Sequence, residues 1–244
     1  MSGHSKWANI KHKKGKSDAA RANVFTKIGR EIAIAVKQGG ADPNSNSKLR
    51  EVILKARQAN MPNDNITRSI KKASGELGSI NYESMTYEGY GVGGTAFIVE
   101  TLTDNKNRTA GDVRHIFDKF GGSMGSTGCV SYLFNRKGVI IVDSASIDED
   151  ALFELAIEAG ADDVVNAEDV FEVYTQPNDL MTVKEYLDNK VTILNASVDM
   201  IPDNTVIPSP DQCSTLIKMI DKFEENDDVQ NVYHNAVLPE EDEE

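Results

Sequence analysis

The first sixteen residues combine basic side chains with a single indole ring and contain no acidic residue. Lysines without acidic partners favour contact with phosphates, and an aromatic ring can stack on a nucleobase. Trp7 has an alternative role, because a lone aromatic side chain is as often an anchor packed against neighbouring helices. In either case the segment indicates a polyanionic partner. The residues concerned are Lys6, Trp7, Lys11, His12, Lys13, Lys14 and Lys16.

Charge is strongly segregated along the 244-residue chain, whose formal net charge is −13. Residues 1–75 hold 16 Lys and Arg against 5 Asp and Glu, a charge of +11, whereas residues 76–244 hold 10 against 34, a charge of −24. This reversal predicts a domain boundary near residues 75–78 and favours a polyanion as the partner of the first segment. The alternative is that the two segments attract each other.

Apolar residues at spacings of three and four predict three short helices in the basic segment, over residues 17–38, 47–60 and about 66–75. Each buries too little by itself, so we expect a three-helix bundle. On the first helix the cations lie opposite the apolar face and are expected to point outward. The last two helices faintly resemble a helix-turn-helix, and the helix dipole offers an alternative role for the terminal lysines. The candidate contacts to phosphates are Lys27, Arg30, Arg50, Lys55, Arg57, Arg68, Lys71 and Lys72.

Beyond residue 80 the pattern alternates between strands and helices, which predicts an α+β fold with two ferredoxin-like modules. We expect residues 130–142 to form two strands around a turn at 135–138, and Thr109 to cap a helix over 109–120. The last helix and strand lack a local partner and are candidates to complete the first sheet. The other expected strands are 95–104, 169–175, 194–200 and 228–234, and the other helices are 148–159, 179–189 and one that begins at Ser209-Pro210.

Signatures of catalysis and of cofactor binding are weak. The glycines of EGYGVGG precede a strand instead of opening a helix, so we interpret them as a flexible turn and not as a dinucleotide site. Cys129 has no identifiable base, Cys213 lies on an apolar helix face, and His4 and His12 stand among lysines that repel cations. We therefore expect no catalytic residue, no metal and no cofactor.

The loop TDNKNRT at residues 103–109 is the most suggestive polar segment of the acidic half. It lies where a strand turns into a helix, a common place for ligand contacts, and Arg108 is a candidate nucleic-acid contact there. Turn chemistry and helix capping explain its asparagines equally well. The longest unbroken apolar run, residues 32–36, is far shorter than the roughly 20 residues of a membrane span, so we expect no membrane contact. The only two cysteines are too few and too far apart for a disulfide framework, so we expect a reducing, cytoplasmic setting.

Several motifs together resemble the YebC/PmpR family over essentially the whole chain. They are GHSKWANIKHKK, FTKIGREI, GGADPNSNSKLR, NMPNDNI, IKKASG, YEGYGVGG, VETLTDNKNRTAGDVRHIFDKFGG and VQNVYHN. The resemblance implies a third domain inserted in the second, with boundaries at 1–79, 80–131 plus 205–239, and 132–204, followed by an acidic tail at 240–244. Members are usually described as bacterial transcriptional regulators, and mitochondrial relatives activate translation.

Residues and resemblance together predict a non-enzymatic regulator of gene expression that binds nucleic acid, most simply a DNA-binding transcriptional regulator. The alternative is a ribosome-associated translation factor that relieves stalled synthesis by binding rRNA or tRNA regions. A charge-segregated chain without an obvious base-reading helix suits both DNA and RNA. The sequence leaves the oligomeric state open between a monomer and a weak dimer.

Overall fold

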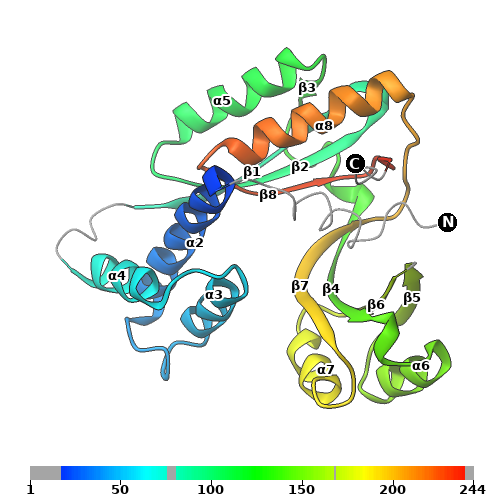
Figure 1. Cartoon of the computed structure of the whole chain (residues 1–244). Helices are drawn as coiled ribbons and strands as arrows, with labels where there is room; N and C mark the ends of the chain where they lie inside the picture. The colour runs from blue at the N-terminus through cyan, green and yellow to red at the C-terminus, as the bar shows by residue number, and fades with distance from the viewer. Residues whose placement is uncertain (1–17, 76–80, 168, 240–244) are drawn as a thin grey trace. The chain divides into compact units, whose positions relative to one another are not determined.

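The computed structural model describes residues 18–75, 81–167 and 169–239 of the chain (Figure 1). They form two compact units. The first unit comprises residues 18–75, 81–129 and 214–232, and the second comprises residues 130–213 and 233–239. The predicted α+β class is confirmed, with three helices followed by two antiparallel four-stranded sheets that carry helices. The three domain boundaries stay a prediction.

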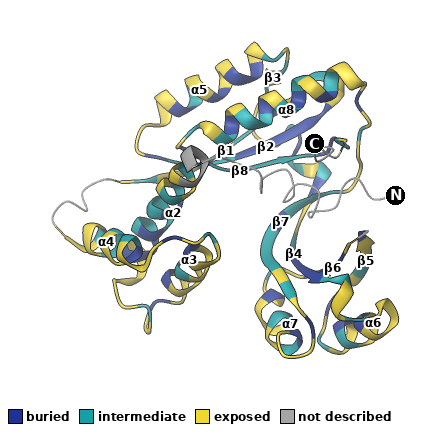
Figure 2. Cartoon of the chain, viewed as in Figure 1, coloured by how far each residue is buried: buried dark blue, intermediate teal, exposed yellow. Residues whose placement is uncertain are grey.

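The three expected helices are present as α2 (Asp18–Gly39), α3 (Ser47–Gln58) and α4 (Asn63–Ser74). Their buried residues, among them Ile32, Leu49 and Ile66, recur at helical spacing and form one apolar core. Asn46 fixes the turn between α2 and α3, because its side chain accepts from the Leu49 N–H at 3.0 Å and donates to the Ala35 carbonyl at 2.7 Å. Because the apolar residues form the core, the polar faces of the three helices point outward (Figure 2).

The first sheet has the strand order β3-β1-β2-β8, with β1 (Glu83–Tyr90), β2 (Ala96–Thr103), β3 (Ser123–Met124) and β8 (Val229–His234). Helices α5 (Lys106–Lys119) and α8 (Pro210–Glu225) pack on this sheet (Figure 1). Phe97, Phe117 and Phe223 form the centre of its core, with ring centroids 5.2 to 6.2 Å apart. The last strand of the chain thus adds to the first sheet, beside β2.

Two expectations for this sheet are wrong. The segment EGYGVGG is not simply a flexible turn, because its first residues belong to β1 and only Val92–Gly94 form a 3-10 turn, η2. Gly89 is required by packing, since a Cβ there would lie 2.8 Å from the Phe117 ring. Thr109 does not cap α5, which begins three residues earlier with Asn105 accepting from the Arg108 N–H at 3.1 Å.

The second sheet has the order β5-β6-β4-β7, with every neighbouring pair antiparallel. Its elements alternate as strand, helix, strand, strand, helix, strand, which is the ferredoxin-like arrangement. The first sheet instead has the β1–β2 hairpin at its centre, because the five residues between these strands are too few for a crossover helix. The elements are β4 (Phe134–Asp143), α6 (Glu149–Glu158), β5 (Asp163–Ala167), β6 (Val170–Thr175), α7 (Leu180–Leu187) and β7 (Ile193–Pro202), with 3-10 turns η3 (Ser131–Leu133) and η4 (Ser144–Ser146) flanking β4.

The expected turn at residues 135–138 is also wrong, because β4 is one continuous ten-residue strand. It pairs on one side with β6 and on the other with β7, so these residues are held in a central ladder. Gly138 is paired with Thr175 there. A Cβ at Gly138 would overlap the Thr175 hydroxyl and lie 2.9 Å from Leu180 Cβ, so the glycine serves close packing rather than a turn.

We predict that Gly138→Ala destabilises the protein by about 1–3 kcal/mol, because an added methyl group overpacks a closed site. Urea unfolding of the full chain, monitored by circular dichroism, measures the change. Gly111→Ala in α5 is the matched control, since a Cβ there meets nothing within 4 Å and alanine is the better helix former. Equal unfolding midpoints for Gly138→Ala and the unaltered protein would contradict this packing role.

Candidate nucleic-acid interface

The cations of α3 and α4 are exposed because apolar residues take the inner face of each helix. On α4, Ile66, Ile70 and Ala73 pack into the bundle, which leaves Arg68 and its neighbours Lys71 and Lys72 on the solvent side. These three cations lie at spacings of three and four and share one stretch of surface. Figure 2 shows the outward faces of α3 and α4 as exposed.

Six cations of these two helices have neither a hydrogen bond nor an ion pair to another described residue through their side chains. We call them the α3–α4 cations. All are exposed, so each retains its full capacity to bind an anion at little desolvation cost. They are Lys48, Arg50, Arg57, Arg68, Lys71 and Lys72.

Other candidate cations are already engaged within the first unit. Lys27 donates to the Glu224 carbonyl at 2.7 Å, and Lys55 pairs with Glu31 at 2.6 Å. Arg30 is only 14 % exposed in its side chain, so the expectation that it points outward from the bundle is wrong. These contacts assign the three side chains a structural role, and their binding to nucleic acid stays a prediction.

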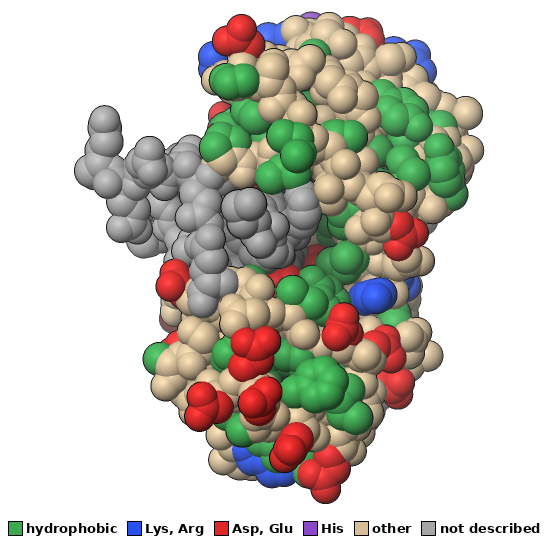
Figure 3. All heavy atoms as spheres, turned by 90° about the vertical axis from the view of Figure 1, so that its right-hand side faces the viewer, with side chains coloured by type: hydrophobic (Ala, Val, Ile, Leu, Met, Phe, Trp, Pro, Cys, Tyr) green, Lys and Arg blue, Asp and Glu red, His purple; other side chains and the backbone are tan. Residues whose placement is uncertain are grey.

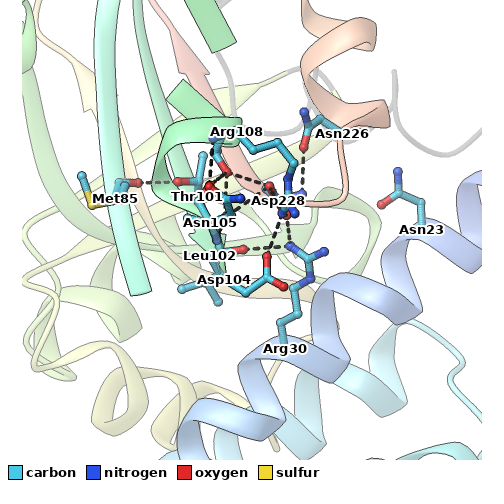
Figure 4. Close-up of polar contacts among 12 residues, drawn as sticks. Asn23, Arg30, Met85, Thr101, Leu102, Asp104, Asn105, Arg108, Asn226 and Asp228 are labelled. Carbon is cyan, nitrogen blue, oxygen red and sulfur yellow. Dashed lines mark hydrogen bonds and ion pairs between the residues drawn. The ribbon is translucent and has the colours of Figure 1, made fainter. Parts of the chain in front are cut away.

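The contact that engages Arg30 is a buried carboxylate, that of Asp228 at the start of β8 (Figure 4). Arg30 donates to it from α2 and also donates to the Leu102 carbonyl at 2.8 Å. Arg108 donates from α5 to both carboxylate oxygens, at 3.0 and 2.7 Å. The hydroxyl of Thr109 lies 2.7 Å from the carboxylate. Helix α2 is thereby fixed to the first sheet through one acid and two arginines.

The hydrogen-bonding surroundings of Asp228 lower the pKa of its carboxyl group. Burial by itself raises the pKa of a carboxyl group, but the hydrogen bonds from Arg108, Thr109 and Arg30 outweigh it and lower the pKa of Asp228 below its ordinary value. The hydrogen bonds to Asp228 and Asp104 raise the pKa of Arg108. Asp228 and Arg108 are therefore both charged at neutral pH. Arg108, a candidate nucleic-acid contact, is held by these two acids, and its binding to nucleic acid stays a prediction.

A groove of about 410 Å³ runs beside the contact between α2 and α4. Four cations of the described residues line it: Arg30 and Lys37 from α2, and Arg68 and Lys72 from α4. Tyr82, just before β1, lines it as well. The groove thus lies in the first unit and includes two of the α3–α4 cations.

The second unit has the opposite electrostatic character. Residues 130–213 hold 4 Lys and Arg against 17 Asp and Glu. Figure 3 shows acidic side chains gathered with hydrophobic ones on the face that carries α6, where Glu149, Asp150, Glu154 and Glu158 are exposed. Such a surface repels polyanions, whereas the excess of Lys and Arg lies in the three helices of residues 18–75.

The basic arm lies outside the described residues. This holds for seven of the candidate contacts, Lys6, Trp7, Lys11, His12, Lys13, Lys14 and Lys16, whose assignment stays a prediction.

Features suited to other chemistry are weak among the residues that the structure describes. Burial and the nearby Glu88 carboxylate raise the pKa of the Cys129 thiol, which disfavours the reactive thiolate. No group of three or more His, Cys, Asp or Glu in residues 18–75, 81–167 and 169–239 is arranged to hold a metal ion. The helices within these ranges are all too short or too polar to cross a bilayer.

Sequence reasoning missed Asp228 and Tyr82. Asp228 stands in the run ENDDVQN, where neighbouring acids hide the one that becomes buried. Its partners Arg30 and Arg108 come from helices that are distant in sequence, so no local spacing indicates the cluster. Tyr82 lies between a glycine-containing linker and a strand that the pattern did not predict.

Comparison with known proteins agrees with the fold and indicates a family whose members are named as regulatory proteins. A family model described as the TACO1/YebC protein N-terminal domain matches residues 5–76, and one described as the TACO1/YebC second and third domain matches residues 82–236. The chain therefore belongs to the TACO1/YebC family, which confirms the resemblance found in its sequence.

Relatives with high identity extend over nearly the whole chain. One from Clostridium tetani is 56% identical over 243 residues, covering 99% of both chains, and one from Treponema denticola is 55% identical over 241 residues, covering 98% of both. Each is named a probable transcriptional regulatory protein. A crystal structure of a conserved hypothetical protein from Aquifex aeolicus is 47% identical and matches with a TM-score of 0.83, covering 97% of this chain and 98% of that one.

The Asp228 cluster yields a stability prediction. We expect Asp228→Asn to destabilise the protein by about 3 kcal/mol at pH 7, because two arginines lose the charge that compensates them. The pKa of Asp228 is lower in the folded chain than in the unfolded one. Its ionic contribution is therefore complete above about pH 4 and is lost as the pH falls further, through the folded-state value.

Urea unfolding at a series of pH values measures this effect, and the difference between Asp228→Asn and the unaltered protein should narrow below about pH 4. Asp104→Asn is the matched control, since this acid pairs with the same Arg108 but is 43% exposed. Its loss should cost less than about 1 kcal/mol. A similar small cost for Asp228→Asn would show that the cluster does not fix α2.

Proposed function

We propose that this protein is a nucleic-acid-binding regulator of gene expression, specifically a DNA-binding transcriptional regulator whose α3–α4 cations contact phosphates. The observation that carries the proposal is the combination of six exposed cations, unpaired among the described residues, with an otherwise acidic chain. The names of the relatives support regulation as the role. The choice of DNA follows those names, since phosphate contacts alone are common to DNA and RNA.

The physical basis is the unequal distribution of charge. Exposed lysines and arginines release condensed counterions when they meet a phosphate backbone, and this release drives binding that is independent of sequence. The acidic second unit contributes repulsion, which favours approach through the first unit. The lysines of the arm at residues 1–16 add five further charges of the same sign. The arginines in contact with Asp228 hold the bundle while the α3–α4 cations bind.

The α3–α4 cations yield a salt prediction. If about five of these side chains contact duplex phosphates, log K should fall against log salt with a slope of about −4 to −5. Replacing Arg68, Lys71 and Lys72 together by glutamine should weaken binding to all sequences about equally. The slope should also become shallower by about one for each phosphate that is no longer neutralised. Fluorescence anisotropy with a labelled duplex measures both quantities.

The control for this experiment replaces Lys106 and Lys222 by glutamine, since each is an exposed lysine already paired with a glutamate, Glu83 and Glu225 respectively. This variant should retain the slope of the unaltered protein. An unchanged slope for the triple α4 variant would exclude α4 from the interface. Loss confined to one DNA sequence would instead indicate base reading.

We predict that the protein in cells copurifies with promoter DNA and that a promoter fragment binds at least about 10³-fold more tightly than random DNA. Crosslinking followed by sequencing of bound DNA and RNA in parallel measures the first, and competition binding the second. Comigration with ribosomes that survives DNase, together with a specificity ratio near one, would contradict the DNA proposal in favour of a ribosomal partner.

A further inference from the structure

The groove between α2 and α4 has features that phosphate binding alone does not require. Among the residues that the structure describes, its lining includes four cations and no acidic residue. It also includes the carboxamide of Asn65 and two aromatic rings, those of Phe25 and Tyr82. Phe25 packs against the core of the bundle, so Tyr82 is the candidate for contact with a ligand. A volume of about 410 Å³ falls within the roughly 300–1,000 Å³ typical of small-molecule sites. The groove is therefore large enough for more than a phosphate.

The groove runs along α2 and α4, and the residues that line it recur at helical spacing on each helix. On α2 they include Gly29, Ala33 and Lys37, and on α4 they include Arg68 and Ser69. The floor is low because small residues meet there: the position of a Cβ on Gly29 would be 3.8 Å from the Ser69 hydroxyl. The short side chains of Gly29, Ala33 and Ser69 leave room between the two helices.

Tyr82 is held in a defined position. The guanidinium of Arg30 lies over its ring, 5.4 Å from the centroid. Arg30 is itself fixed by Asp228 and by the Leu102 carbonyl, so the ring rests on an anchored cation. An ordered aromatic ring in a positively charged groove is the combination with which proteins hold single-stranded nucleic acid.

We propose that this groove receives one nucleotide of a single-stranded segment, with the base against Tyr82 and the phosphate between Arg68 and Lys72. The aromatic ring gives the site a preference for a base over a bare phosphate, because every base has a π-face to stack. The four cations among the described lining residues give it a preference for anions. The inference rests on the proposed function and adds that the bound nucleic acid presents an unpaired nucleotide to the first unit.

The test uses two labelled probes of equal charge and the full chain. One is an oligothymidylate of about 12 nucleotides, within the usual site sizes of single-strand binders, and the other is an abasic backbone with the same number of phosphates. The unaltered protein should bind the base-bearing probe about tenfold more tightly, as expected for one stacked base. Tyr82→Leu should abolish that preference while leaving the affinity for the abasic probe within about twofold, because the phosphate contacts remain.

Tyr132→Leu is the matched control, because this tyrosine is 69% exposed and belongs to the second unit. It should leave the preference unchanged. Circular dichroism establishes whether Tyr82→Leu is folded. If it is not, Ser69→Leu, which fills the floor of the groove, serves as the second variant and should reduce the preference in the same way.

The outcomes separate the groove from the proposed function. Equal affinity for the two probes, or a preference that survives both Tyr82→Leu and Ser69→Leu, would overturn the nucleotide site while phosphate binding by the α3–α4 cations stands. Absence of binding to either probe and to duplex DNA at low salt would overturn the proposed function as well.

Discussion

A single buried carboxylate, that of Asp228, joins the basic bundle to the first sheet and engages Arg30 of α2. Burying Asp228 has a desolvation cost that only direct compensation can offset, and the structure supplies it from α2 and α5, through Arg30 and Arg108. Breaking such a pair leaves an uncompensated charge, so the arginines and the acid depend on one another. The cluster therefore holds α2 against the first sheet, and α3 and α4 present their charges from a fixed support.

The basic residues of the bundle fall into two groups, those that make structural contacts and those that are exposed. Lys27 and Arg30 of α2 contact the end of α8 and the start of β8, whereas the cations of α3 and α4 lie on exposed faces. The groove beside α2 combines both kinds, since its wall includes the engaged Arg30 and the unpaired Arg68. The side chains that anchor the bundle and those proposed to bind a ligand are thus neighbours in one small bundle.

The sequence predicted the features that depend on local periodicity. The three helices follow from apolar spacing, as Ile28, Ile32 and Val36 illustrate, and the charge reversal near residue 75 marks the basic segment without any structure. Contacts between distant residues were not predictable in this way. Whether Arg30 meets phosphate or Asp228 depends on the placement of β8, almost 200 residues later.

Glycine is a second source of error. The sequence pattern favours turns at Gly138 and at the glycines near residue 90, but two of these glycines lie within strands where a neighbouring element approaches too closely for a side chain. A glycine that permits close packing and one that permits a turn look alike in a single sequence. The strand β1 escapes prediction for this reason, and with it the position of Tyr82 beside the bundle.

The central claim is that the exposed cations of α3 and α4 bind a polyphosphate chain. Photochemical crosslinking of the full chain to DNA, followed by mass spectrometric mapping of the attached peptides, tests it most directly. If these cations hold the phosphates, adducts should form on peptides from residues 47–75 and disappear at high salt. Adducts confined to residues 130–213, or insensitive to salt, would contradict it.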